Sequence, residues 1–328
     1  MSEITDVFGF IDLLTGYQPA MVVMAARRLG VFENLTSEPC DVADMAATIG
    51  VDAAALGALL RSLAGIGLAV EDGGRFATTP FVAAHMAGGR DLALVIEKEE
   101  YFARAWLSLG DVVRTGRPAL EPWKSRLASD PATAHMFLDA LNVLAEHTGP
   151  RPWDLPELAP GRRVLDVGGG FGYFAFRLAE AGSAVVLVDL PPVIEALERR
   201  LNTLPDVSIE LIAVDVMTAP SCGVDAGSVD AALVSHMVHD LSEEEGVDLL
   251  RRVCSAVRSG GTVVVNDFAG DVGPGAFGPL FDVMMRVETG GAAYPLATLR
   301  SMLEAAGLQE VRAVEVPEPV TLLMGRVA

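Results

Sequence analysis

The 328-residue sequence has few cysteines and few positive charges, and each shortage excludes a class of protein. The three cysteines, Cys40, Cys222 and Cys254, are scattered and lack the spacing of a metal site or a disulfide framework, so we expect a reducing, cytoplasmic environment. Lysine and arginine number 24 against 44 acidic residues, giving a formal net charge of −20. Proteins that neutralise nucleic-acid phosphates need the opposite balance, so we expect no nucleic-acid partner.

Long hydrophobic runs are also missing. No stretch approaches the roughly 18 uninterrupted apolar residues typical of a membrane span. The segment MSEITDVFGFIDLL carries acids where a secretory signal carries positive charge. We therefore expect no membrane association. Only 6% of the residues are aromatic, but 51% are hydrophobic, and the chain is long enough for one large or two ordinary domains.

Residues 1–98 are predicted to form a mainly helical domain. The segment PAMVVMAARRLGVFENL has apolar residues at helical spacing up to Gly30. The next segment, from Cys40, predicts two helices and then a hairpin around Asp72-Gly73-Gly74. This order of elements is typical of a winged helix-turn-helix.

Charge argues against DNA binding by this winged helix. Between Thr36 and His85 the only basic residues are Arg61 and Arg75, whereas six residues are acidic. A helix built from DAAALGALLRSLAG offers almost nothing to phosphates or base edges. We expect dimerisation or a scaffold role, and a regulatory module built on the winged helix is a remote alternative.

Residues 99–328 are predicted to contain connector helices and then, from about residue 151, an α/β domain with a Rossmann-like sheet. Ser129-Asp130-Pro131 is a start signal for the helix PATAHMFLDALNVLAEH. Strand-like segments then alternate with helical ones: RRVLDVGG, AVVLVDL, IELIAVDV, VDAALVSH, GTVVVNDF and VTLLMGRV. This alternation predicts a largely parallel sheet with ligands at the carboxyl ends of its strands.

The segment VLDVGGGFG resembles a ligand-binding turn between a strand and a helix. Gly168, Gly170 and Gly172 do not have the G-x-G-x-x-G spacing of a dinucleotide site. Asp166, just before them, would repel a pyrophosphate and attract an ammonium group. We therefore predict a nucleoside that carries an amino acid, and disfavour an NAD dehydrogenase.

Two further acids end the next two predicted strands. Asp189, 21 residues after Gly168, has the position of an acid that accepts hydrogen bonds from ribose hydroxyls. Asp215 ends IELIAVDV and, with Val216 and Met217, is placed to reach an adenine. Three acids on successive strands beside a glycine loop form a specific signal.

Six segments in this order resemble the S-adenosylmethionine (SAM)-dependent O-methyltransferase family of bacterial natural-product and small-molecule metabolism: DVGGGFG, VDLPPVIE, VDVM, HMVHDLSEEEGVDLLRRV, SGGTVVVND and LRSMLEAAGL. The resemblance spans nearly the whole chain. It implies a class I methyltransferase domain, an N-terminal winged-helix dimerisation domain, an intertwined homodimer and a substrate pocket between the domains. It also assigns cofactor contacts, from the sulfur to the adenine, to Ser235, Gly168, Gly170, Asp189, Leu190, Asp215 and Val216.

The resemblance implies that His239 is a general base and that Asp267 orients it. An imidazole suits this task because its unperturbed pKa lies near neutrality. We assign His236 to the pocket wall or to structure. The sequence departs from the family at Leu241, where a tryptophan is usual, and in GGAAYP, where a second acid is usual. Tyr294 in that segment is a candidate replacement donor for the histidine.

These departures keep alternatives open. O-methylation is the leading interpretation. The others are C- or N-methylation, and a SAM-binding relative that catalyses hydroxylation, decarboxylation or rearrangement. Relatives that bind a metal through a His-Asp pair need a further histidine near residue 290, which this sequence lacks, so we expect no metal. Apolar groups that suit an aromatic or polyketide-like acceptor are Trp106, Phe137, Leu141, Met237, Met284, Met285 and Tyr294.

Overall fold

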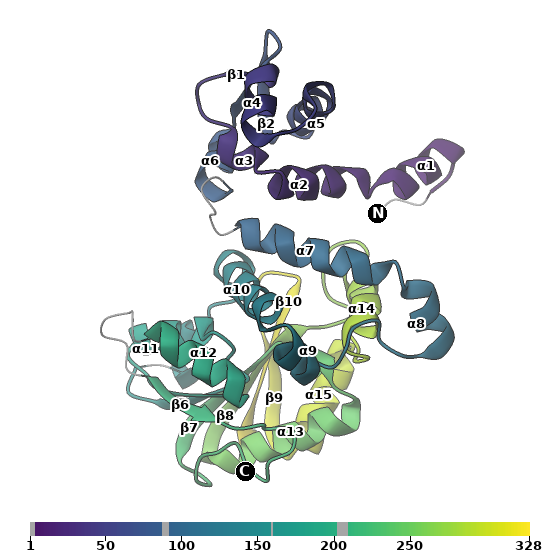
Figure 1. Cartoon of the computed structure of the whole chain (residues 1–328). Helices are drawn as coiled ribbons and strands as arrows, with labels where there is room; N and C mark the ends of the chain where they lie inside the picture. Colours follow the sequence, from purple (N-terminus) through teal and green to yellow (C-terminus); the bar gives the residue numbers. More distant parts are fainter. Residues whose placement is uncertain (1–3, 87–91, 159, 202–208) are drawn as a thin grey trace. The chain divides into compact units, whose positions relative to one another are not determined.

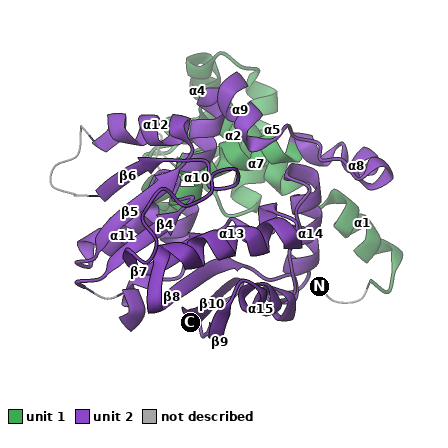
Figure 2. Cartoon of the chain, turned by 90° about the horizontal axis from the view of Figure 1, so that it is seen from below, with its two compact units in different colours: residues 1–103, 139–143 green, residues 104–138, 144–328 purple. Residues whose placement is uncertain are grey.

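The chain divides into two units in the computed structural model, which describes residues 4–86, 92–158, 160–201 and 209–328 (Figures 1 and 2). One unit comprises residues 1–103 and 139–143, and the other comprises residues 104–138 and 144–328. The boundary expected at residue 98 and the one in the structure, after Ala103, both fall inside helix α7 (Leu92–Trp106). Five residues of α10 (Pro131–Thr148) belong to the first unit.

The first unit contains helices and a small antiparallel sheet in the order β1-β3-β2. Its elements are α1 (Val7–Thr15), α2 (Gln18–Arg28), α3 (Val31–Asn34), β1 (Cys40–Asp41), α4 (Val42–Ile49), α5 (Ala53–Gly65), β2 (Ala69–Asp72), β3 (Arg75–Thr78), α6 (Pro80–His85) and most of α7. The predicted hairpin is confirmed: Gly73 and Gly74 have φ of 57° and 81°, as a two-residue turn of type I′ requires. Phe32, Leu60 and Phe76 are buried in the core.

Large apolar side chains are exposed on the first N-terminal helix, α1. No residue of α1 is buried, although the helix carries six large apolar side chains that are exposed: Val7, Phe8, Phe10, Ile11, Leu13 and Leu14. Within the described residues, the stretch Val7–Arg28 is long and apolar enough to cross a bilayer. A second candidate span exists if the bent helix pair Val42–Ile49 and Ala53–Gly65 is counted as one span. Gly16 and Tyr17 separate α1 from α2 within that stretch.

The second unit is built on a seven-stranded sheet in the order β6-β5-β4-β7-β8-β10-β9, in which β10 runs antiparallel to both neighbours. The strands are β4 (Arg163–Val167), β5 (Ala184–Asp189), β6 (Ile209–Ala213), β7 (Val229–Ser235), β8 (Val257–Phe268), β9 (Leu308–Val314) and β10 (Val320–Val327). The predicted Rossmann-like, largely parallel sheet is therefore confirmed. Strand β9 was not predicted from the sequence.

Helices cover both faces of this sheet. The helices of this unit are α8 (Leu109–Thr115), α9 (Trp123–Ser129), most of α10, α11 (Tyr173–Glu180), α12 (Pro191–Leu201), α13 (Glu243–Ala256), α14 (Phe277–Glu288) and α15 (Leu296–Ala305), with 3₁₀ turns η1 (Pro152–Asp154), η2 (Pro156–Leu158) and η3 (Val238–Asp240). Alternate residues along each strand face opposite sides: Leu165 packs in one core cluster with α13 and α15, and Val164 packs in the other with α11 and α12. The start of α10 is also as predicted, since Asp130 accepts a hydrogen bond from the Thr133 amide.

Candidate active site

The strand ends that carry the predicted site residues meet at one edge of the sheet. In the parallel register, Val167 lies beside Val188 and Val234, and Ser235 lies beside Asn266. The carboxyl ends of β4, β5, β7 and β8 are therefore level. Ligands of open α/β sheets bind at this edge.

The glycine loop after β4 depends on left-handed backbone. Gly168 and Gly170 have φ of 66° and 55°, a region that other residues rarely adopt. The Gly168 amide donates to the Val188 carbonyl at 2.8 Å. A Cβ at Gly168 would lie 2.2 Å from the sulfur of Met237, so that side chain lies directly against the loop. Met237, expected to contact substrate, is thus placed beside the predicted methionine end of the cofactor.

Asp166 is a buried acid without a hydrogen-bond partner. It is 1% exposed, and neither carboxylate oxygen is paired. Burial, with the nearby charge of Asp189, raises the pKa of Asp166 to about 7. An uncompensated buried charge is costly, and a cation beside it removes that cost. The side chain therefore fits the ammonium group of an amino acid, which SAM carries.

Asp189 and Asp215 are held by backbone amides. The Asp189 carboxylate accepts from the Gly170 and Leu190 amides at 2.8 and 2.6 Å, which ties the strand end to the glycine loop. Burial raises its pKa to about 6, against the effect of those two amides. Asp215 follows the end of β6 by two residues, accepts from the Met217 amide at 3.2 Å and is ion-paired with Lys124 of α9.

The neighbouring contacts complete the cofactor side of this edge. Val216 is buried beside Asp215, and Ser235 at the end of β7 accepts a hydrogen bond from the Asn266 amide group at 3.4 Å. All the positions that the sequence assigned to the cofactor thus belong to one unit and to this edge or the loops that leave it. Their direct contacts with a cofactor remain a prediction.

Asp267 and His239, which the family resemblance pairs, are in direct contact. The chain leaves β7 through His236, whose φ of 53° turns it back into η3. The amides of Val238 and His239 then donate to one Asp267 oxygen at 3.1 and 3.3 Å. The other Asp267 oxygen is hydrogen-bonded to His239 Nδ1. Aspartate therefore reaches the histidine because η3 packs directly on the end of β8.

This contact fixes the ring and its charge. Burial on its own would lower the pKa of His239, but the negative charges of Asp267 and then Asp240 raise it to about 9. Burial opposes ionisation of Asp267 too, yet His239 and the amide donors hold its pKa below the usual range. With Nδ1 occupied by Asp267, Nε2 is the nitrogen left for a substrate proton, and it lies 3.6 Å from the Asp240 carboxylate.

His236 differs from His239 although both rings are close, with centroids 6.1 Å apart. Burial lowers the pKa of His236 to about 4, so this ring is neutral at pH 7. Its Nε2 lies 3.4 Å from the Asn266 side chain. Side-chain atoms of His236, His239 and Asp267 lie within 4.8 Å of one another, and we interpret this group as a hydrogen-bonded cluster.

Three phenylalanines surround the histidines and were not singled out from the sequence. Phe281 of α14 presents its ring edge-on to His239 at 5.2 Å, and Phe268 lies 4.9 Å from His236. Phe277 stacks on Phe281 at 5.8 Å. The signal was available: Phe277 and Phe281 are four residues apart and share a face of one helix.

The predicted acceptor-binding residues are not all brought together. Tyr294 donates its hydroxyl to the Leu241 carbonyl at 2.7 Å, so this donor is already used and does not replace the missing acid at His239. Phe137 packs on Trp123, with ring centroids 5.5 Å apart. Leu141 is exposed and lies in the first unit. Trp106 is half-buried and Met285 buried in the second unit.

A buried acid near His239 was missed from the sequence. Glu288, the last residue of α14, is 6% exposed and forms an ion pair with Arg126 of α9 at 3.3 Å. It continues the stripe of Phe277 and Phe281 at helical spacing. A charged residue on an apolar helix face was the available signal.

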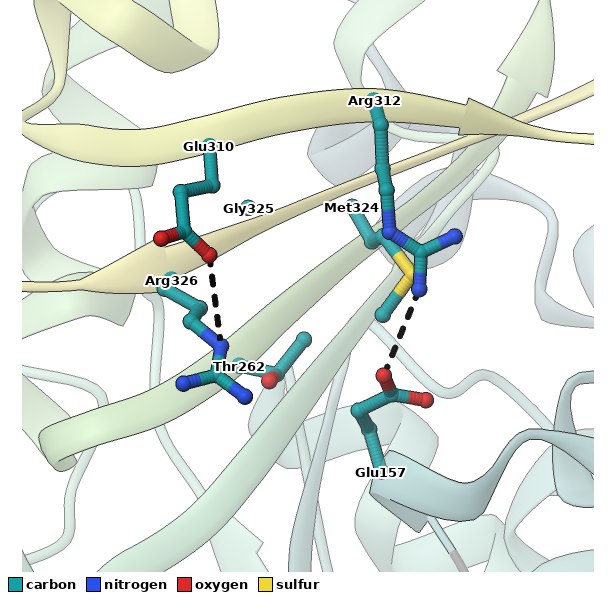
Figure 3. Close-up of a pocket in the computed structure, with 7 residues that line it drawn as sticks. All are labelled: Glu157, Thr262, Glu310, Arg312, Met324, Gly325 and Arg326. Atoms are coloured by element: carbon teal, nitrogen blue, oxygen red, sulfur yellow. Dashed lines mark hydrogen bonds and ion pairs between the residues drawn. The ribbon is translucent and has the colours of Figure 1, made fainter.

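A recess elsewhere on the second unit carries no predicted site residue (Figure 3). Charged side chains dominate its lining and pair with each other: Arg312 with Glu157 at 3.4 Å, and Arg326 with Glu310 at 3.7 Å. Thr262, which also lines it, precedes Asp267 by five residues on β8. At about 3.3 Å per residue, the recess is on the order of 16 Å from the His239–Asp267 contact.

Comparison with known proteins agrees with this geometry. Residues 106–309 match the model of the O-methyltransferase domain family. The chain belongs to this family. This methyltransferase is 28% identical to 3-hydroxy-5-methyl-1-naphthoate 3-O-methyltransferase of Streptomyces sahachiroi, covering 94% of this chain and 91% of that protein. It is 26% identical to mouse acetylserotonin O-methyltransferase, covering 94% and 85%.

Solved structures show the same fold. The structure of PigF with SAH has a TM-score of 0.87 at 22% identity and covers 99% of this chain and 100% of that one. Human N-acetylserotonin methyltransferase in complex with SAM has a TM-score of 0.85 at 21% identity and covers 99% of both chains. The protein is thus a SAM-dependent O-methyltransferase with a class I fold.

Proposed function

We propose that the enzyme methylates a hydroxyl group of a small aromatic acceptor, with His239 as the general base and Asp267 as the residue that orients it. The observation that supports this most is the buried contact of His239 Nδ1 with Asp267, which leaves Nε2 as the proton-accepting atom. Relatives named for aromatic acceptors, such as the naphthoate and acetylserotonin enzymes, support the choice of acceptor class.

The residues of the site have two separate roles, binding the cofactor and removing the acceptor proton. When SAM is bound, it supplies a methyl group already activated on a sulfonium. Asp166 would hold the ammonium group of the amino-acid part, the loop at Gly168 would approach that part closely, and Asp189 would accept hydrogen bonds from the ribose. His239 removes the acceptor proton: the O–H bond breaks, and the proton moves to Nε2.

The aromatic side chains near His239 support a flat acceptor. Phe268 and Phe281 lie beside the two histidine rings, and aromatic faces and edges pair well with a planar substrate. Such contacts would align the acceptor oxygen with the base, and alignment supplies much of the rate in a displacement reaction.

Three experiments test this proposal. Calorimetric titration should show micromolar binding of SAM and none of NAD, and a panel of phenols should give products heavier by one methylene unit, with the methyl carbon bonded to oxygen by NMR. His239→Ala should leave SAM affinity unchanged and lower turnover by at least about a hundredfold, the size of a general-base effect. Wild-type turnover in that variant, or a methyl group on carbon or nitrogen, would contradict the proposal.

We also propose that the chain forms a homodimer through its N-terminal helices, and that its location is cytoplasmic. The exposed apolar side chains of α1 support the dimer because a helix with no buried residue gains little from its own chain. The acidic winged-helix segment supports a dimerisation role of the first unit rather than DNA binding.

A further inference from the structure

A buried ion pair lies next to the catalytic histidine, and the proposed reaction does not use it. The pair joins Arg126 of α9 to Glu288 of α14, 162 residues away in the sequence. Only 11% of the Arg126 side chain and 7% of the Glu288 side chain are exposed. Because burying two charges costs free energy that their attraction only partly returns, such a pair is weak as a stabilising device. Its position calls for another explanation.

The backbone that follows Glu288 is attached to His239. The Ala292 amide donates to the His239 carbonyl at 2.9 Å. Gly291 allows this approach, since a Cβ there would lie 2.0 Å from the same carbonyl oxygen. The Thr289 hydroxyl accepts from the Gly291 amide at 3.2 Å and donates to the Met285 carbonyl at 3.3 Å, which ties this turn to α14. The end of α14 and η3 therefore form one fixed assembly.

Helical spacing places Glu288 on the face of α14 that meets the histidine. Glu288 follows Phe281 by seven residues, close to two helical turns, so the two residues share a face of the helix. The Phe281 ring is itself in edge contact with His239. Glu288 and the imidazole thus lie on the same side of α14.

Charged and titratable groups face His239 from several elements: Asp267 from β8, Asp240 from η3 itself, His236 from the end of β7, Glu288 from α14 and, behind Glu288, Arg126 from α9. The negative charge of Glu288 adds to the effects that raise the pKa of His239. Burial and then Asp240 raise the pKa of Glu288 to about 6, against the effect of Arg126. Glu288 is therefore ionised at the pH at which His239 titrates.

We propose that Glu288 is a positioning residue that stabilises the protonated imidazole of His239, and that Arg126 holds the Glu288 carboxylate in place for this purpose. The acid would serve where the segment Gly291-Ala292-Ala293 offers none. This inference rests on the proposed role of His239 as the base. The carboxylate does not take the substrate proton, which stays on His239 Nε2.

The test measures the pKa of His239 directly. The five histidines of the SAM-free protein are titrated by NMR of ¹⁵N-labelled imidazoles, with His239 assigned from the His239→Gln variant. Glu288→Gln should lower the pKa of His239 by about 0.5–1 pH unit, since it removes one partly screened charge. The pH profile of kcat/KM should move to lower pH by the same amount. Arg126→Lys, which keeps the positive charge, should retain most of the wild-type titration.

Glu157→Gln is the matched control, because Glu157 also pairs with an arginine, Arg312, but at the distant recess of Figure 3. It should leave the His239 titration unchanged. An unchanged His239 pKa in a folded Glu288→Gln protein, with or without a lower melting temperature, would overturn the proposal. A shifted His239 pKa with an unshifted rate profile would uphold the coupling to Glu288 and instead contradict His239 as the base.

Discussion

At His239, neighbouring carboxylates set the pH at which the base becomes available. Only the neutral imidazole accepts a proton. Against the effect of burial, Asp267, with further effects of Asp240 and Glu288, raises the pKa of this imidazole from 6.5 to about 9. We therefore expect kcat/KM to rise as the pH increases from 7 to 9. Asp267→Asn should move this rise to lower pH, because burial then dominates, and should lower the plateau because the ring is less well held. A rate independent of pH over this range would contradict the assignment.

The same shift predicts how stability depends on pH. The pKa of His239 in the folded state is above its unfolded value, so the contact with Asp267 stabilises the fold fully below about pH 6.5. This contribution is lost as the pH rises through about 9. Melting temperatures of the wild type should therefore fall across this window more than those of His239→Gln.

We expect the buried carboxylate of Asp166 to strengthen SAM binding and to lower the stability of the SAM-free protein. Because its carboxylate is buried without a hydrogen-bond partner, Asp166→Asn should increase the free energy of unfolding of the SAM-free protein at pH 8 by about 1–3 kcal/mol. The same variant should bind SAM at least about tenfold more weakly, since an ammonium group loses its counter-charge. Asp248→Asn, at an exposed site on α13, should change neither. Unchanged stability and affinity in Asp166→Asn would contradict its assignment.

At the scale of elements, the junction between α14 and η3 positions His239. Gly291→Ala should force the Ala292–His239 hydrogen bond apart, because its Cβ would lie 2.0 Å from the His239 carbonyl oxygen. We expect a loss of stability of about 1–3 kcal/mol and a larger proportional loss of turnover than of SAM affinity. Denaturant unfolding and calorimetry measure the two. Gly110→Ala, on α8 with open space around it, is the control and should be neutral or slightly stabilising.

The strands that frame the site could be predicted because each is a short apolar run between turn signals. Strand β9 was missed because LQEVRAV mixes charges into an edge strand, where one side faces solvent. The acids at the strand ends followed from spacing and from the family resemblance. The partnership of Arg126 and Glu288 could not be predicted, because nothing local relates two residues on helices so far apart in the sequence.

Whether Asp267 reaches His239 also lay beyond sequence reasoning. An aspartate is one methylene shorter than the glutamate usual in the family, and its reach depends on the left-handed turn at His236 that packs η3 on β8. Positive φ at a non-glycine residue is rarely visible in a sequence. The residue types therefore predicted the chemistry, and the backbone decided the contact.

At the scale of the whole molecule, the apolar surface of α1 predicts an assembly. Phe8 is 80% exposed and Leu14 58%, and each would contribute about 1.5–3 kcal/mol if a second copy of the chain buried it fully. Phe8→Glu combined with Leu14→Glu should convert a dimer into a monomer in light scattering after size exclusion. The fold should survive, because no residue of α1 is buried in its own chain.

Two further comparisons separate this dimer from other uses of the same surface. Val113→Glu, which removes an apolar side chain that is 78% exposed on α8, should leave the dimer intact. The stretch Val7–Arg28 also has the length and composition of a bilayer span, so the wild type and the double variant should be floated with phosphatidylcholine vesicles. If the wild type floats with the vesicles and the variant does not, α1 serves a lipid surface. If neither protein floats and only the variant is monomeric, the apolar face of α1 is an interface between two copies of the chain. The variant is then monomeric because the glutamates at positions 8 and 14 would leave unpaired carboxylates inside that interface.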